Sequence, residues 1–201
     1  VDILDSEKLE QVSSMINNAN KDNNIETEFR FGKIEGKFNP SMPLNVVETV
    51  KNKMSQTNFI LQEDIFVDVY DKEIRTRYLY SYDFDKYILQ ESVIKNRISN
   101  FDINMKDLSN FDLRVAMSSE IKIQEYNLIG SAYKKVRTSY VEPQQNFKVD
   151  LTTIIEGEYR DRTFIENKEK SYKYQIEVEI INNKINTNNL IVFIYNLVNQ
   201  N

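Results

Sequence analysis

The sequence contains no cysteine and no histidine in 201 residues. Without cysteine there are no disulfides or zinc–thiolate sites, and without histidine there are no imidazole proton shuttles and no serine–histidine or cysteine–histidine nucleophiles. Glycine is scarce, at four residues, and no GxGxxG or P-loop pattern is present. Any catalysis by this chain therefore has to use carboxylates, lysine, arginine, tyrosine or hydroxyl groups.

Long apolar runs and targeting signals are also missing. No run approaches the roughly 20 apolar residues of a membrane span, and no signal-peptide pattern is present, so we expect a protein that is not secreted. The chain begins with Val1, which suggests part of a longer protein. The net charge of −5 argues against non-specific coating of nucleic acid, although local basic clusters can still hold a phosphate chain. The length fits one domain with a sizeable core.

Three segments have apolar residues at helical spacing. Residues 5 to about 20, 43 to about 54, and 188 to 198 are predicted as helices, the first behind a cap at Asp5 or Ser6 and the second with Pro43 in its first turn. Each apolar stripe is typical of a helix that packs on a core.

Residues 25–32 and 174–180, near opposite ends of the chain, predict strands with carboxylates on one face. Side chains alternate between the two faces of a strand, so one face of each segment gathers acidic residues. They are Glu26, Glu28, Glu177 and Glu179. Glu-x-Glu is also common on the solvated face of antiparallel sheets. If one sheet brings the two faces together, however, they supply ligands for a hard cation.

Charge keeps recurring on one face of the predicted strands between the last two helices. The pairs are Arg75 and Arg77, Lys95 and Arg97, Arg114 and Glu120, Lys135 and Arg137, Lys148 and Asp150, and Glu156 and Glu158. Either open antiparallel sheets with polar outer faces or a closed sheet with its polar face inward produces this pattern. The mixture of both signs, with few threonines and glutamines, favours the closed barrel. Because buried charges are costly unless they pair or bind a ligand, such an interior predicts a functional site.

Six of these motifs, in chain order, resemble the triphosphate tunnel metalloenzymes. Within them, the similarity is to the metal-dependent RNA triphosphatases of fungal, protozoan and large-DNA-virus mRNA capping systems, most closely the mimivirus type. The segments that carry the resemblance are 26–32, 74–77 with 94–98, 112–120, 135–140, 148–152 and 175–179.

The resemblance implies a fold and an activity. The fold would be mainly β (α+β): an eight-stranded antiparallel barrel, or tunnel, with a charged interior and helices packed outside, in a single domain over residues 1–201. The activity would be removal of the γ-phosphate from 5′-triphosphate RNA to leave a 5′-diphosphate end, the first step of mRNA capping, with nucleoside triphosphates also cleaved in Mn²⁺. Guanylyltransferase and methyltransferase domains would follow on the full-length chain, at a viral transcription site in the cytoplasm or virion.

The resemblance also implies roles for individual residues. Mg²⁺ or Mn²⁺ would be held by Glu26, Glu28 and Glu179. The phosphates would be clamped by Arg75, Lys95, Lys135, Arg137 and Lys148, of which Lys135 and Arg137 would also stabilise the charge that develops during the reaction. Glu120 or Glu177 would orient the attacking water. The residues that organise this set would be Arg30, Arg77, Arg114, Asp150 and Thr152.

Three positions depart from the family pattern. Lys148 replaces an arginine, which keeps the charge but loses the bidentate fork. Gln175 replaces the first glutamate of the last strand and is not expected to bind metal. Tyr133 stands where relatives carry another basic residue.

Two other kinds of function fit the same motifs. One is another tunnel enzyme, such as an inorganic tripolyphosphatase, a thiamine triphosphatase or an adenylate cyclase. The other is a non-enzymatic barrel that binds polyphosphate or uses its charges only for structure. The motifs all address phosphate, so they do not separate these substrates.

Overall fold

The computed structural model describes residues 3–18, 22, 24–105 and 109–199. Over these residues the chain forms ten strands and three helices. In chain order they are α1 (Ser6–Asn18), β1 (Ile25–Glu35), β2 (Lys37–Asn39), α2 (Leu44–Ser55), β3 (Ile60–Asp71), β4 (Ile74–Ser81), β5 (Lys86–Ile103), β6 (Asp112–Lys122), β7 (Gly130–Val141), β8 (Phe147–Arg160), β9 (Thr163–Glu166), β10 (Lys173–Ile180) and α3 (Thr187–Val198).

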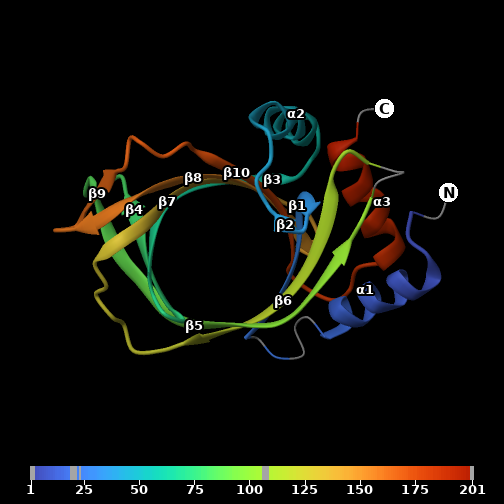
Figure 1. Cartoon of the computed structure of the whole chain (residues 1–201), viewed down its shortest axis with the longest axis horizontal. Coiled ribbons are helices and arrows are strands. Elements are labelled where there is room, and N and C mark those ends of the chain that lie inside the picture. Colours follow the sequence, from blue (N-terminus) through green and yellow to red (C-terminus); the bar gives the residue numbers. More distant parts are fainter. Residues whose placement is uncertain (1–2, 19–21, 23, 106–108, 200–201) are drawn as a thin grey trace.

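Eight of the strands close into an antiparallel barrel. Neighbouring strands follow the order β10, β1, β6, β5, β4, β3, β7 and β8, and β8 pairs back onto β10. The ribbon therefore forms a complete ring when the molecule is viewed along the barrel (Figure 1). The short strands β2 and β9 lie outside the ring, paired with the ends of β1 and β8. The predicted eight-stranded barrel is confirmed.

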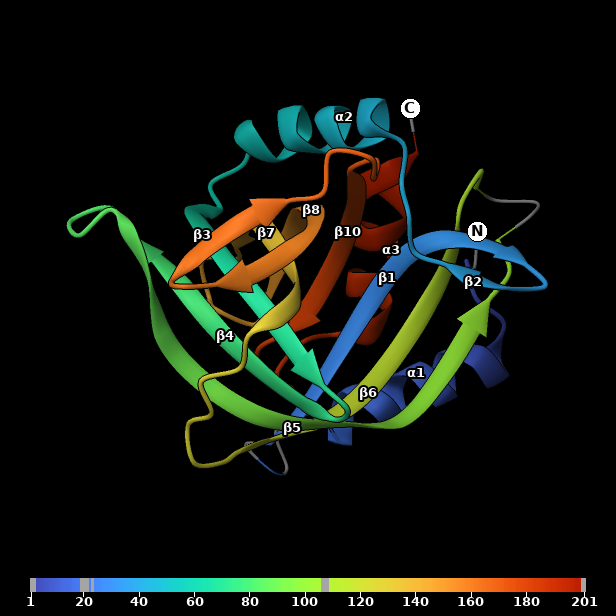
Figure 2. The ribbon, with the colours of Figure 1, turned by 60° about the vertical axis from the view of Figure 1, so that its left-hand side comes forward.

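All three predicted helices are present and lie outside the barrel (Figure 2). Asp5 caps α1, since its carboxylate accepts a hydrogen bond from the backbone N–H of Lys8 at 2.9 Å. Pro43 precedes α2, and Asn186 caps α3. The predicted extension of the first helix to residues 19 and 20 lies outside the described residues. None of the described helices is long and apolar enough to cross a membrane.

The hydrophobic core lies between the helices and the outer face of the barrel. Val12 of α1, Val50 of α2 and Leu190 of α3 are almost fully buried against apolar residues of β1, β6, β8 and β10. A smaller apolar cluster, which includes Val67 and Tyr159, covers the outer face of β3, β7 and β8. Because the apolar face of each strand points outward to these cores, the alternating polar face points into the barrel.

Gly32 allows the end of β2 to pack closely against β1. A Cβ atom at this position would overlap the backbone carbonyl of Asn39 and the ring of Phe38. The close approach of β2 therefore requires glycine at the end of the Glu-x-Glu-x-Arg-x-Gly motif. This hairpin forms one rim of the barrel.

Candidate functional site

A cavity of about 360 Å³ lies inside the barrel, and we call it the chamber. Fifteen residues line it, of which seven are basic and six are acidic. They are Glu26, Glu28, Arg30, Tyr70, Arg75, Arg77, Glu91, Lys95, Glu120, Lys135, Arg137, Lys148, Gln175, Glu177 and Glu179. The strand alternation thus brings together almost all the predicted site residues, which come from seven of the eight barrel strands, all except β3.

One wall of the chamber, formed by β1 and β10, carries clustered carboxylates. Glu28 and Glu179 lie directly opposite each other in the β1–β10 register, where like charges repel. Burial, reinforced by the charge of Glu177, raises the pKa of Glu28 to about 7. Burial also raises the pKa of Glu26, to which the nearby carboxylates of Glu120 and Glu179 contribute. The negative form of this wall is therefore unfavourable without a compensating cation.

The carboxylate wall fits a divalent cation by residue type. Oxygen ligands suit Mg²⁺ or Mn²⁺, and the chain has no histidine or cysteine to favour a softer metal. Within the described residues, no three acidic side chains already converge as a metal site. Each predicted ligand instead contacts a cationic side chain: Glu26 with Lys95 at 3.2 Å, Glu28 with Arg30 at 2.6 Å, and Glu179 with Lys148 at 3.2 Å. To hold a metal, these glutamates would have to turn from their present partners.

All five predicted phosphate-binding residues line the chamber, on β4, β5, β7 and β8. These residues are Arg75, Lys95, Lys135, Arg137 and Lys148. Two of them, Lys95 and Lys148, pair directly with Glu26 and Glu179 of the carboxylate wall. This placement agrees with the predicted clamp, while phosphate binding itself stays a prediction.

Glu120 holds two of the clamp cations. Its carboxylate accepts from both terminal nitrogens of Arg75, at 3.2 and 3.3 Å, and pairs with Nζ of Lys95 at 2.9 Å. These cations keep the pKa of Glu120 below its usual value, although burial acts to raise it. Arg75 also donates to Glu91 at 2.9 Å, but its buried Nε has no hydrogen-bond acceptor among the described residues. A buried donor of this kind is costly unless a ligand supplies an acceptor.

Glu177 is the more deeply buried of the two candidates for orienting water. It is 6% exposed, and one of its oxygens lies 3.0 Å from Nε of Arg30. Burial acts to raise the pKa of Glu177, but Arg30, Arg137 and Lys135 outweigh it and lower the pKa. Glu177 is thus held as an anion between β1 and the clamp.

Asp68 of β3 is a site residue that none of the predicted motifs contains. Its side chain is fully buried and accepts hydrogen bonds from Arg77 at 2.7 and 2.9 Å and from Lys135 at 3.0 Å. Although burial acts to raise its pKa, these two cations hold the pKa of Asp68 well below its usual range. Beside it, the ring of Phe66 lies under the guanidinium groups of Arg77 and Arg137, 4.0 and 5.1 Å from the ring centre. Asp68 therefore links β3, β4 and β7 from within.

Four of the five predicted organising residues contact the clamp or line the chamber. Nε of Arg137 donates to the hydroxyl of Thr152 at 3.1 Å. Asp150 accepts from Ser139 at 2.6 Å and lies 3.4 Å from Nζ of Lys148. Arg30 and Arg77 line the chamber itself.

Arg114 does not line the chamber. Its guanidinium forms hydrogen bonds to Asp102 at 2.6 and 2.9 Å and lies over the ring of Phe38, 4.6 Å from its centre. Both contacts lie at the β1–β2 rim of the barrel. Among the described residues, no direct contact joins Arg114 to the clamp, so its predicted organising role stays a prediction.

The family comparison decides what kind of barrel this is. A family model described as the mRNA capping enzyme beta chain, the mRNA triphosphatase family, matches residues 62–190, well over half of the chain. The chain belongs to the mRNA capping enzyme beta-chain family. The matched segment runs from β3 into α3 and includes the whole clamp, while Glu26 and Glu28 precede it.

Several solved structures share this fold at low sequence identity. The Pct1 RNA triphosphatase of S. pombe is 16% identical, with a TM-score of 0.68 over 90% of this chain and 81% of that chain. A mimivirus capping enzyme triphosphatase is 15% identical, with a TM-score of 0.67 over 98% of this chain and 99% of that chain. The RNA triphosphatase domain of a trifunctional mimivirus mRNA capping enzyme is 16% identical, with a TM-score of 0.64 and full coverage of both chains. At these identities the likeness shows a shared fold. A comparison with curated proteins finds no match.

Proposed function

We propose that this family member is a metal-dependent RNA 5′-triphosphatase that removes the γ-phosphate of triphosphate-ended RNA and leaves a 5′-diphosphate end. The observation that carries the proposal is the chamber, in which a wall of glutamates faces a clamp of lysines and arginines inside a closed barrel. A triphosphate chain with its divalent cation has the complementary arrangement of charges. Membership of the mRNA capping enzyme family supports RNA as the substrate.

The clamp residues would act by binding and by stabilising charge. Phosphoryl transfer depends mainly on positioning and on neutralising the phosphate oxygens. Arg75, Lys135 and Arg137 reach the chamber from strands that cannot move independently, because each is fixed in the barrel ladder. Their carboxylate partners hold them in place before substrate arrives, which is the arrangement expected for electrostatic preorganisation.

The carboxylate wall would bind the cation and position water. Glu26, Glu28 and Glu179 would hold Mg²⁺ or Mn²⁺, which when bound would neutralise charge on the transferred phosphate. Of the two candidates for orienting the attacking water, Glu177 is better placed, because Arg75 occupies both oxygens of Glu120. Glu120 would then position Arg75 and Lys95.

We infer the wider setting of the reaction from a structural relative. A structural relative is one domain of a trifunctional mimivirus capping enzyme. This supports further domains for guanylyl and methyl transfer on the full-length protein, acting at a viral transcription site.

Exchanging Arg137 for lysine tests the clamp. The substitution keeps the charge but removes the planar fork that Thr152 and Phe66 orient. Loss of one charge-assisted hydrogen bond, worth about 1.5–3 kcal/mol, is expected to lower kcat/KM about 10- to 150-fold. Steady-state kinetics on triphosphate RNA measures the effect. The matched control is Arg160→Lys, on the exposed end of β8. Unchanged kinetics for Arg137→Lys and for Arg137→Ala would show that Arg137 does not hold phosphate.

The proposed reaction is tested by analysing the ends of the RNA product. We expect release of one inorganic phosphate per γ-labelled RNA, a diphosphate product, and no reaction in excess EDTA. Monophosphate ends as the first product would contradict the proposal. Rapid cleavage of tripolyphosphate without any reaction on RNA would instead favour an inorganic tripolyphosphatase, and absence of hydrolysis with tight tripolyphosphate binding would favour a non-enzymatic barrel.

A further inference from the structure

A second, larger cavity of about 820 Å³ adjoins the chamber, and we call it the vestibule. Arg30, Tyr70, Lys135 and Gln175 line both cavities, so the two spaces meet at these residues. The rest of the vestibule is formed largely by the β1–β2 hairpin and the segment after it, together with Tyr133, Ile154 and Lys173. None of the phosphate-directed motifs explains this space.

The vestibule lies at a defined end of the chamber. Along β1 the inward residues run from Glu26 through Glu28 to Arg30, and only Arg30 of these three also lines the vestibule. On β10, Gln175 reaches the vestibule but Glu177 and Glu179 do not. A triphosphate whose terminal phosphate lies at the carboxylate wall would therefore extend its other end toward the vestibule.

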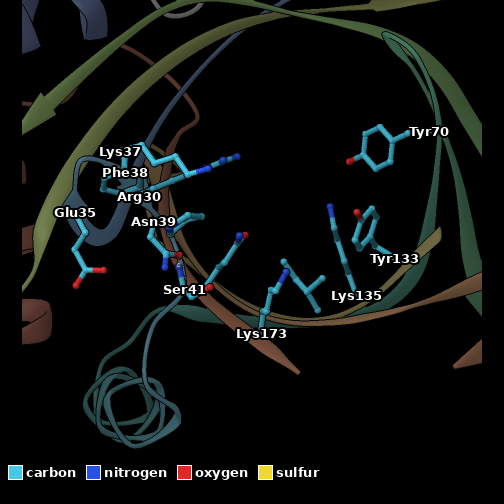
Figure 3. Close-up of a pocket in the computed structure, with 13 residues that line it drawn as sticks. Arg30, Glu35, Lys37, Phe38, Asn39, Ser41, Tyr70, Tyr133, Lys135 and Lys173 are labelled. Atoms are coloured by element: carbon cyan, nitrogen blue, oxygen red, sulfur yellow. Dashed lines mark hydrogen bonds between the residues drawn. The ribbon is translucent and has the colours of Figure 1, made fainter. Parts of the chain in front are cut away.

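Two tyrosines form one side of this space. Figure 3 shows Tyr70 and Tyr133 next to each other beside Lys135. Their ring centres are 6.1 Å apart at an interplanar angle of 73°, and the residues are 44% and 39% exposed. In proteins that bind single-stranded nucleic acid, bases stack on exposed aromatic rings of this kind next to basic side chains that contact the phosphates.

Basic side chains lie on the other sides of the vestibule. Lys37, on β2, is exposed and has no ion pair among the described residues. Lys173, on β10, pairs with Glu156 at 3.1 Å but remains 54% exposed. In Figure 3, Lys37 and Arg30 lie on the side opposite the two tyrosines. An aromatic face opposite basic side chains can bind both a base and the phosphate that follows it.

We propose that the vestibule binds the first nucleotides of the RNA, with the 5′-terminal base stacked on Tyr133 beside Tyr70 and the next backbone phosphate contacted by Lys37. The inference rests on the proposed function, since it takes the triphosphate of the same RNA to occupy the chamber. It adds a direction of entry and a source of preference for nucleotide substrates over inorganic tripolyphosphate.

The test compares three substrates: triphosphate-ended RNA, a nucleoside triphosphate and inorganic tripolyphosphate. Tyr133→Ala is expected to lower the ratio of kcat/KM for RNA to that for tripolyphosphate by about 5- to 150-fold, the range for loss of one base stack. The ratio for the nucleoside triphosphate should fall similarly. Tyr133→Phe should retain both ratios, because the ring remains. Tyr82→Ala, 74% exposed on the β4–β5 turn, is the control and should leave all ratios unchanged.

The Lys37→Gln variant tests the contact with the following phosphate independently of the base stack. The variant should raise the KM only for RNA, which is the one substrate with a downstream phosphate. It should also reduce the slope of log KM for RNA against log salt concentration by about 0.7. An equal loss on the nucleoside triphosphate would overturn this contact, since Lys37 would then touch the triphosphate chain.

The outcomes for the vestibule and for the proposed function differ. If the wild type cleaves RNA but Tyr133→Ala leaves the RNA-to-tripolyphosphate ratio unchanged, the vestibule proposal fails and the RNA triphosphatase function stands. If the wild type cleaves tripolyphosphate but not RNA, the proposed function fails first. Thermal melting of each variant confirms that the fold is retained.

Discussion

Glu28→Gln and Glu179→Gln are each expected to lower kcat at least about 100-fold, because each removes a carboxylate that would bind the metal directly. The two residues are opposite each other in the β1–β10 register, so they act on the same point of the chamber. Phosphate release in saturating Mn²⁺ measures the loss. Calorimetric titration of the free protein with Mn²⁺ should show the same variants binding the ion more weakly. The control is Glu10→Gln, an exposed carboxylate on α1 outside the barrel.

The stability of Glu28→Gln distinguishes a metal ligand from a structural ion pair. Burial and Glu177 raise the pKa of Glu28 to about 7, so its charged form is disfavoured in the folded protein even beside Arg30. A neutral glutamine should therefore leave the melting temperature in EDTA equal to or above that of the wild type near pH 8. A variant that loses several degrees while keeping its activity would show that Glu28 serves the fold rather than the metal.

Strand alternation predicted which side chains share the polar face of each strand, and this face lines the barrel interior. In β1, β4, β7, β8 and β10 the charged residues recur at every second position, so they lie on one face of each strand. Once that face is taken to point inward, all of them are placed in the barrel interior. The predicted residues Glu26, Arg75, Lys135 and Glu179 all line the chamber as a result. The register between strands was not needed for that prediction, because the inward faces of all eight barrel strands enclose the same interior.

The contribution of β3 could not be found in the same way. Its first five residues are exposed on both faces, so alternation is visible only from Ile65 onward, and Asp68 is a single acid within an apolar run. The sequence contains the signal, since a lone carboxylate between Val67 and Val69 requires a cationic partner. Which cations pair with it depends on β3 lying between β4 and β7, and that neighbour order comes only from the folded barrel.

Arg114 is a residue whose face was predicted correctly but whose position along the barrel was not. It shares the inward face of β6 by alternation, yet it lies opposite Asp102 in the β5–β6 register and outside the chamber lining. The strand is longer than the chamber, so alternation predicts the face of a side chain but not its depth along the barrel. The ion pairs have the same origin: Glu120 meets both Lys95 and Arg75 because β6, β5 and β4 are consecutive in the ring.

Asp68→Asn is expected to destabilise the protein by about 3–5 kcal/mol, because it leaves Arg77 and Lys135 as buried cations without their shared carboxylate. Asparagine has nearly the same shape, so the loss would come from charge rather than from a cavity. Urea unfolding at pH 7, followed by circular dichroism, measures the change in the free energy of unfolding. Asp64→Asn, an exposed position on the same strand, should change it by less than about 0.5 kcal/mol.

The pH dependence of this difference tests its electrostatic cause. The folded-state pKa of Asp68 is lowered from 3.8, so the carboxylate stabilises the fold above its unfolded-state pKa and loses that effect as pH falls through its folded-state pKa. The stability gap between wild type and Asp68→Asn should therefore be constant near neutral pH and narrow only in acid below about pH 4. A gap that is unchanged at pH 2, or absent at pH 7, would mean that Asp68 does not hold the clamp by charge. Lys135 donates a hydrogen bond to Asp68, which holds it in position. Asp68→Asn should therefore also raise the KM for tripolyphosphate, because a misplaced Lys135 binds phosphate more weakly.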